Sequence, residues 1–151
     1  MNVGEICVRH VVTVRELDGL TQAAEVMREK HIGYLVVVGP KVGESGFAPI
    51  GVLTYRDIVV GVVAKDTDPK TLRVGDLMTR QPVVVDEDAS LTQALSEMRR
   101  IGVRRIPVVG HNGLLTGVLS LDDILGALSE ELSDVAGSIR KEVRMEEALR
   151  P

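Results

Sequence analysis

The chain contains the same sequence unit twice, and this duplication limits the folds open to it. Residues 3–38 align without a gap on residues 74–109, and 14 of the 36 aligned positions are identical. Unrelated sequences of ordinary composition would share about two. After one gap, GVLTYRDI at 51–58 matches GVLSLDDI at 117–124 at five of eight positions. A duplicated unit predicts an internal pseudo-twofold axis, with a cleft between the copies as the first place to look for a binding site.

Each copy predicts the order strand, helix, strand, strand, helix. β-Branched runs at 11–14 and 82–85 predict the first strands. Hairpin strands follow at 35–38 with 50–53, and at 106–109 with 114–119, and a second helix begins at Thr54 or Ser120. Apolar residues at helical spacing predict one buried face on each first helix, formed by Leu20, Ala23, Ala24 and Met27 or by Leu91, Ala94, Leu95 and Met98.

The repeat boundaries predict an α+β fold packed as one body. A three-stranded sheet with two helices leaves one face uncovered, so we expect the copies to bury that face against each other. The predicted divisions are residues 1–66 for the first repeat, 67–128 for the second and 129–151 for a helical extension. The loop at 39–49 is five residues longer than its counterpart and is the main difference between the halves.

Composition excludes several classes of function. The net charge of −4 and only three aromatic residues argue against a nucleic-acid partner. Apolar runs of about seven residues are too short to cross a bilayer, which needs roughly 20, so no membrane partner is expected. A single cysteine, Cys7, and an N-terminus without signal-peptide character indicate a cytoplasmic protein.

No catalytic or metal motif is visible. The three histidines are scattered at positions 10, 31 and 111 without companion cysteines or an H-E-x-x-H spacing, so no metal site is expected. Nucleophile-elbow, Walker and dinucleotide-binding patterns are absent from the sequence. We therefore expect a protein that is not an enzyme and has no required cofactor.

The motifs GVLTYRD and GVLSLDD have two interpretations. Thr54 with Asp57, and Ser120 with Asp123, have the spacing of a helix N-cap followed by an acid in the first turn. The same groups suit a nucleotide, because a helix N-terminus favours a phosphate and a carboxylate can accept two hydrogen bonds from a ribose. A glycine three residues earlier, within a strand, usually marks close approach of a ligand or of another backbone segment. Spacing alone leaves both interpretations open.

The whole pattern resembles the cystathionine-β-synthase-type (CBS) domain family, in which two tandem copies form a Bateman module. The resemblance covers nearly all of residues 3–128, and VGDLMTRQPVVVDEDASLTQALSEMRRIGVRRIPVV followed by GVLSLDDIL carries it. It implies a regulatory module whose cleft between the repeats holds AMP, ADP, ATP, NAD or S-adenosylmethionine.

The resemblance also implies the ligand-binding residues of two sites. Asp57 and Asp123 would bind ribose, and Thr54 and Ser120 would lie beside the phosphates, with Arg56 and Asp122 as neighbours in the same motifs. The base near Asp123 would contact Val8, Val11, Thr13, Ile32, Gly33 and Tyr34. The base near Asp57 would contact Thr79, Pro82, Val84, Val103 and Arg104.

The two predicted sites differ in charge and bulk. Arg104 and Arg105 stand where the first copy has Gly33 and Tyr34. We expect both guanidinium groups near Asp123, so that this site prefers ligands with more phosphate charge. The alternative is that both arginines only lie on a solvated edge. Tyr34 either stacks on the base or fills the pocket.

The C-terminal stretch extends beyond the repeat. Leu125, Leu128, Leu132, Val135 and Ile139 follow a 3–4 spacing that predicts an apolar helix face. That face either packs on its own domain or forms a homodimer contact, as the resemblance also suggests. The predicted function is a homodimeric sensor of adenine nucleotides that regulates an unknown protein by changing shape. The alternative is a ligand-free dimeric scaffold in which the Thr/Ser and Asp pairs are only helix caps.

Overall fold

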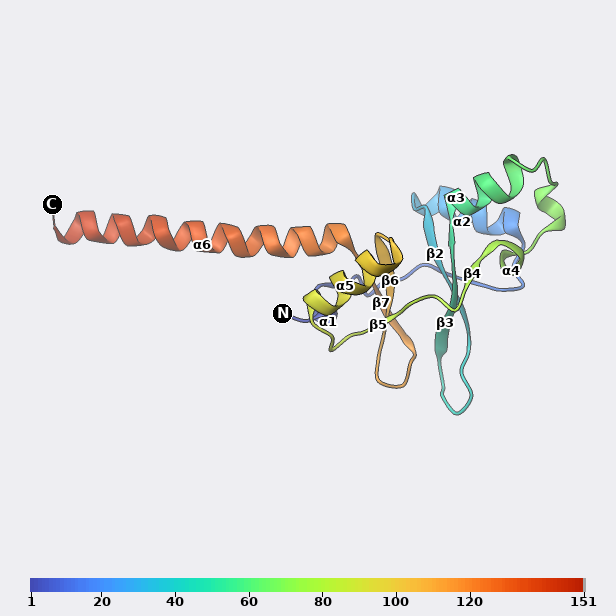
Figure 1. Ribbon diagram of the computed structural model, residues 1–151, viewed down its shortest axis with the longest axis horizontal. Coiled ribbons are helices and arrows are strands. Elements are labelled where there is room, and N and C mark those ends of the chain that lie inside the picture. Colours follow the sequence, from blue (N-terminus) through green and yellow to red (C-terminus); the bar gives the residue numbers. More distant parts are fainter. Residues whose placement is uncertain (151) are drawn as a thin grey trace.

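Each copy folds around the hairpin that its alternating apolar residues predict. The computed structural model describes residues 1–150 and contains two sheets with helices beside them (Figure 1). The first sheet has the order β1-β2-β3-β4, with β1 at Thr13–Arg15, β2 at Tyr34–Pro40, β3 at Phe47–Thr54 and β4 at Thr79–Arg80. The second has the order β5-β6-β7, with β5 at Val85–Asp86, β6 at Arg105–Val109 and β7 at Leu115–Ser120.

The strands pair alike in both copies. The first strand of each repeat runs parallel to the second, and the second and third form an antiparallel hairpin. The predicted α+β fold and its order of elements are therefore confirmed. The first strands begin later than predicted, because residues 11–12 and 82–84 precede the paired strands.

The first helices are α2 at Leu20–Lys30 and α5 at Leu91–Ile101. Ser90 and Gln93 form a reciprocal capping box on α5, whereas Gly19 caps α2 without a side-chain bond. The predicted apolar faces are buried at five positions and partly buried at Ala24 and Leu91, whereas Leu95 is 37% exposed. After β3, the short helix α3 at Tyr55–Ile58 continues into a π-helix, Val59–Val63.

The two cores exchange segments of chain. The one-turn helix α1, Val3–Ile6, contributes Val3 to a core that is otherwise built from the second repeat, and Cys7 lies there too as a small buried side chain. The equivalent helix α4, Val74–Leu77, follows a 3-10 turn at Pro69–Thr71 and sends Val74 and Met78 into the first core. Each repeat therefore completes the core of the other, which joins both into one body.

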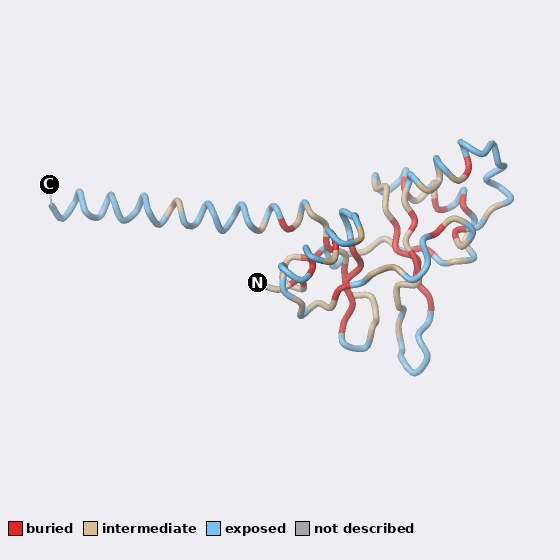
Figure 2. Tube along the Cα trace, viewed as in Figure 1, coloured by how far each residue is buried: buried red, intermediate tan, exposed pale blue. Residues whose placement is uncertain are grey.

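The last helix, α6 at Leu121–Leu149, projects away from both sheets (Figure 1). Ile124 is its buried residue, and Figure 2 shows almost all of the rest as exposed. The option that this helix packs on its own domain is therefore wrong. Pro151, the end of the predicted extension, lies outside the described residues. Among the described residues, no helix has the length and apolar character needed to cross a membrane.

Candidate functional site

Two cavities lie between the repeats, one beside the aspartate of each repeated motif. The Asp123 cavity has a volume of about 360 Å³ and combines the N-terminus of α6 with chain from the first repeat. Its lining residues are Val8, His10, Val11, Val12, His31, Ile32, Gly33, Tyr34, Arg105, Val118, Ser120 and Asp123.

The Asp57 cavity is larger, at about 610 Å³, and combines the N-terminus of α3 with chain from the second repeat. Its lining residues are Gly33, Tyr34, Val52, Thr54, Tyr55, Arg56, Asp57, Thr79, Gln81, Pro82, Val83, Ile101, Gly102, Val103, Arg104, Arg105 and Pro107. Both volumes fall in the roughly 300–1,000 Å³ range of small-molecule sites.

The Thr/Ser and Asp pairs are helix caps in the structure. The Thr54 amide donates to Asp57 Oδ2 at 2.8 Å, and the Asp57 amide donates to Thr54 Oγ1 at 3.2 Å. Ser120 and Asp123 make the same reciprocal bonds at 2.9 and 3.1 Å. Each cap uses one carboxylate oxygen and one hydroxyl lone pair, so the second oxygen and the hydroxyl hydrogen are left to face the cavity. Capping and ligand binding are therefore compatible.

The strand glycines of the two motifs make room for the protein's own chain. A Cβ at Gly51 would lie 2.6 Å from Met78 Sδ, and one at Gly117 would lie 2.7 Å from Cys7 Sγ. Met78 and Cys7 are equivalent positions in the repeats and belong to the exchanged segments. Of the two causes that the sequence left open for these glycines, the structure shows backbone approach.

Most predicted site residues line the cavities, but three do not. Thr13 and Val84 are equivalent positions, and both are exposed while the preceding valines, Val12 and Val83, line the cavities. The chain leaves the cavities after Val12 and Val83, so Thr13 and Val84 are exposed to solvent instead of lining them. Asp122 is also exposed, and it lies 3.9 Å from the Arg104 guanidinium rather than in a cavity.

The cations are distributed differently from the prediction. Arg104 lines the Asp57 cavity and not the Asp123 cavity, and Arg105 lines both. Three arginines, Arg56, Arg104 and Arg105, line the Asp57 cavity, whereas the Asp123 cavity is lined by Arg105 and two histidines, His10 and His31. Of the two arginines expected beside Asp123, Arg105 therefore lines that cavity, while the Arg104 guanidinium lies 3.9 Å from Asp122 at the exposed start of α6.

Tyr34 forms a wall of both cavities and fills neither. Its hydroxyl is buried and has no hydrogen-bond partner among the described residues. Burial raises the pKa of Tyr34, since the phenolate would lose its hydration, and the nearby charge of Arg105 opposes this only in part. Because its oxygen has almost no contact with solvent, the hydroxyl is not presented to a ligand in either cavity.

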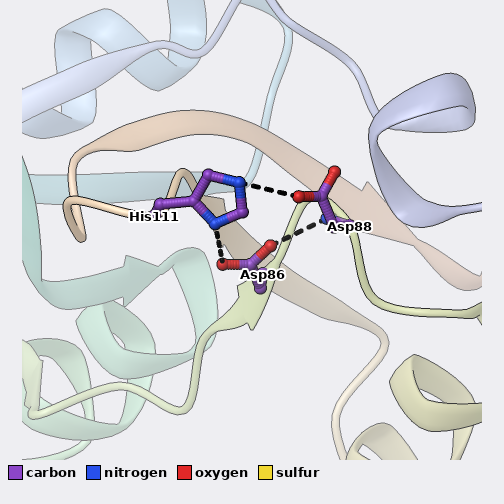
Figure 3. Close-up of side chains that lie close together, drawn as sticks. All are labelled: Asp86, Asp88 and His111. Atoms are coloured by element: carbon purple, nitrogen blue, oxygen red, sulfur yellow. Dashed lines mark hydrogen bonds and ion pairs between the residues drawn. The ribbon is translucent and has the colours of Figure 1, made fainter.

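A cluster of Asp86, Asp88 and His111 also forms, which the sequence spacing did not reveal. His111 Nε2 lies 2.8 Å from Asp88 Oδ2, and Nδ1 lies 3.7 Å from Asp86 Oδ2 (Figure 3). The hairpin between β6 and β7 brings the histidine to the end of β5, so no local motif could signal it. The imidazole and the carboxylates are mutual partners on the exposed surface, and we assign no cation to them.

The sequence matches the family model described as CBS domain at residues 3–64 and 74–130. The chain belongs to the CBS-domain family. It is 35% identical to an uncharacterised protein of Methanopyrus kandleri over 83% of this chain and 61% of the relative, so it spans less than two thirds of that protein. It is also 36% identical to hypoxic response protein 1 of Mycobacterium tuberculosis, over 86% of this chain and 82% of that one.

Solved CBS structures share this arrangement. Hypoxic response protein I, solved with two coordinated zinc ions, superposes with a TM-score of 0.70 and 34% identity over 83% of this chain and 97% of that one. CBSX2, solved in complex with AMP, superposes with a TM-score of 0.67 and 27% identity over 85% of this chain and 96% of that one. The chain is thus a CBS pair, a type of regulatory module.

Proposed function

We propose that this CBS pair senses adenosine-containing ligands, without catalysing a reaction, by binding them in the Asp57 and Asp123 cavities. One observation carries the proposal: each cavity sets a capped helix N-terminus of one repeat against apolar chain of the other. A ligand that contacts both repeats can shift the equilibrium between two arrangements of the repeats, provided that it binds these arrangements with different affinity. The AMP complex of the related CBSX2 supports adenosine as the common part of the ligand.

The charges suggest how the ligand lies. Phosphates would face the hydroxyl and the helix N-terminus, where amide dipoles favour an anion, and ribose would face the free carboxylate oxygen. Because three arginines line the Asp57 cavity, we propose that it takes the more highly phosphorylated ligand. AMP, ADP, ATP, NAD and S-adenosylmethionine all contain the adenosine unit that these contacts would hold.

A thermal-shift panel of these five ligands tests the proposal. A ligand at a hundred times its Kd should stabilise the protein by about 2.7 kcal/mol, which raises Tm by several degrees. Asp57→Asn and Asp123→Asn keep an oxygen for the cap but remove the charge, so each should lose the shift from its own cavity. Asp122→Asn is the matched control, because Asp122 lies beside Asp123 outside the cavity. A flat panel on the wild type would favour the ligand-free scaffold.

We also propose that the chain acts as a homodimer joined through α6. The exposed apolar face of that helix consists of Leu125, Leu128, Leu132, Val135, Ile139 and Val143, and these side chains are 41–70% exposed. A helix with one apolar face and few contacts to its own domain needs a partner surface, and a second copy offers an identical one. The apolar spacing is the observation that supports this pairing.

A further inference from the structure

Tyr34 and Arg105 occupy equivalent positions in the two repeats, yet they lie face to face. The 71-residue offset of the repeats relates one to the other. The Arg105 guanidinium carbon is 5.9 Å from the centroid of the Tyr34 ring. Equivalent residues of a duplicated unit meet only near the axis that relates the copies. This pair therefore marks the pseudo-twofold axis of the molecule.

The pair also separates the two cavities. Gly33, Tyr34 and Arg105 are the residues that line both of them. Tyr34 is paired across the sheet with Thr54, and Arg105 with Ser120. The Arg105 side chain thus starts beside the hydroxyl of one cavity and extends towards Tyr34 on β2, which is the cross-strand neighbour of the hydroxyl residue of the other cavity.

The Arg105 guanidinium is free to bind a ligand. Within residues 1–150, Arg105 has no carboxylate partner, in contrast to Arg104 with Asp122. The Tyr34 hydroxyl is buried without a partner. A phosphate bound through two parallel hydrogen bonds compensates most of the guanidinium charge, so the same arginine attracts a phosphate in the second cavity less.

We propose that Arg105 and Tyr34 are shared by the two cavities, so that an anionic ligand in one lowers the affinity of the other for a second anion. The inference rests on the proposed function and adds its regulation. A first phosphate-bearing ligand recruits Arg105, and the second cavity then lacks that cation. The coupling acts equally in both directions, because it is a difference in binding free energy. A neutral adenosine makes no demand on Arg105, so two adenosines should bind independently.

Isothermal titration calorimetry on the full chain tests this, with ADP and adenosine as probes. Asp57→Asn and Asp123→Asn give the intrinsic affinity of each remaining cavity. In the wild type, the second ADP should bind roughly tenfold or more weakly than that intrinsic value, within the range typical of coupled sites. In Arg105→Ala, the second ADP should bind with the intrinsic affinity of its cavity. The second adenosine should do so in both proteins. Circular dichroism checks that Arg105→Ala is folded.

The possible outcomes separate this inference from the proposed function. Binding of neither probe to the wild type overturns the coupling, and a flat thermal-shift panel of all five ligands overturns the sensing function as well. Two independent ADP sites in the wild type overturn the coupling and leave the sensing function intact. A difference that persists in Arg105→Ala also overturns the coupling, since repulsion between the phosphates would then explain it. One ADP bound by both proteins overturns it as well, since one cavity would then be unused. One ADP in the wild type and two in Arg105→Ala would support it.

Discussion

At the scale of single residues, the chain uses side chains for more than one purpose. Thr54 and Asp57 cap a helix and line a cavity, and the same holds for Ser120 and Asp123. Cap bonds fix the orientation of each carboxylate before any ligand arrives, which reduces the entropy that binding must remove. Tyr34 is different, because its buried hydroxyl costs free energy without a compensating bond.

Tyr34→Phe should therefore leave the free energy of unfolding at pH 7 unchanged or raise it by about 1 kcal/mol. The raised pKa of Tyr34 also predicts a pH effect. As pH rises past the ordinary tyrosine pKa of about 10, Tyr34 ionises in the unfolded chain before it ionises in the folded one. The stability that neutral Tyr34 contributes is therefore complete below pH 10 and is lost as pH rises above it. Urea denaturation at pH 7 and about 10.5 should show a smaller alkaline loss in Tyr34→Phe. A clear loss of stability at pH 7 would reveal a hydrogen bond to the hydroxyl.

At the scale of elements, glycines in a strand and in a helix should respond in opposite ways. Gly117 in β7 faces the exchanged segment, and a Cβ added there would lie 2.9 Å from the Val8 carbonyl oxygen, so Gly117→Ala should cost about 1–3 kcal/mol. Gly126 in α6 has no atom within 4 Å of such a Cβ. Gly126→Ala should stabilise the helix by about 0.5–1 kcal/mol. Urea denaturation and far-ultraviolet circular dichroism measure the two effects, and equal responses would contradict this packing.

At the scale of the whole molecule, we propose that α6 joins two copies of the chain. The double variant Leu132→Glu/Ile139→Glu places two charges on the exposed apolar face and should convert the proposed dimer to a monomer, because a buried unpaired charge is costly. Light scattering after size exclusion measures the mass. Lys141→Glu is the control, since it changes the net charge by the same two units on the opposite face of the helix. A double variant that stays dimeric would place the contact elsewhere.

The sequence by itself determined the properties that depend on local patterns and on the repeat. Apolar spacing, the capping pairs and the duplication predicted the strands, the helices and the CBS fold, because these features act between residues that are close along the chain. Tertiary structure decided what depends on distant segments. It exchanged α1 and α4 between the cores, explained Gly51 and Gly117, left Thr13 and Val84 outside the cavities that Val12 and Val83 line, and placed the Arg104 guanidinium beside Asp122. Which residues line a cavity depends on contacts between segments that are far apart in the sequence, and no local pattern contains those contacts.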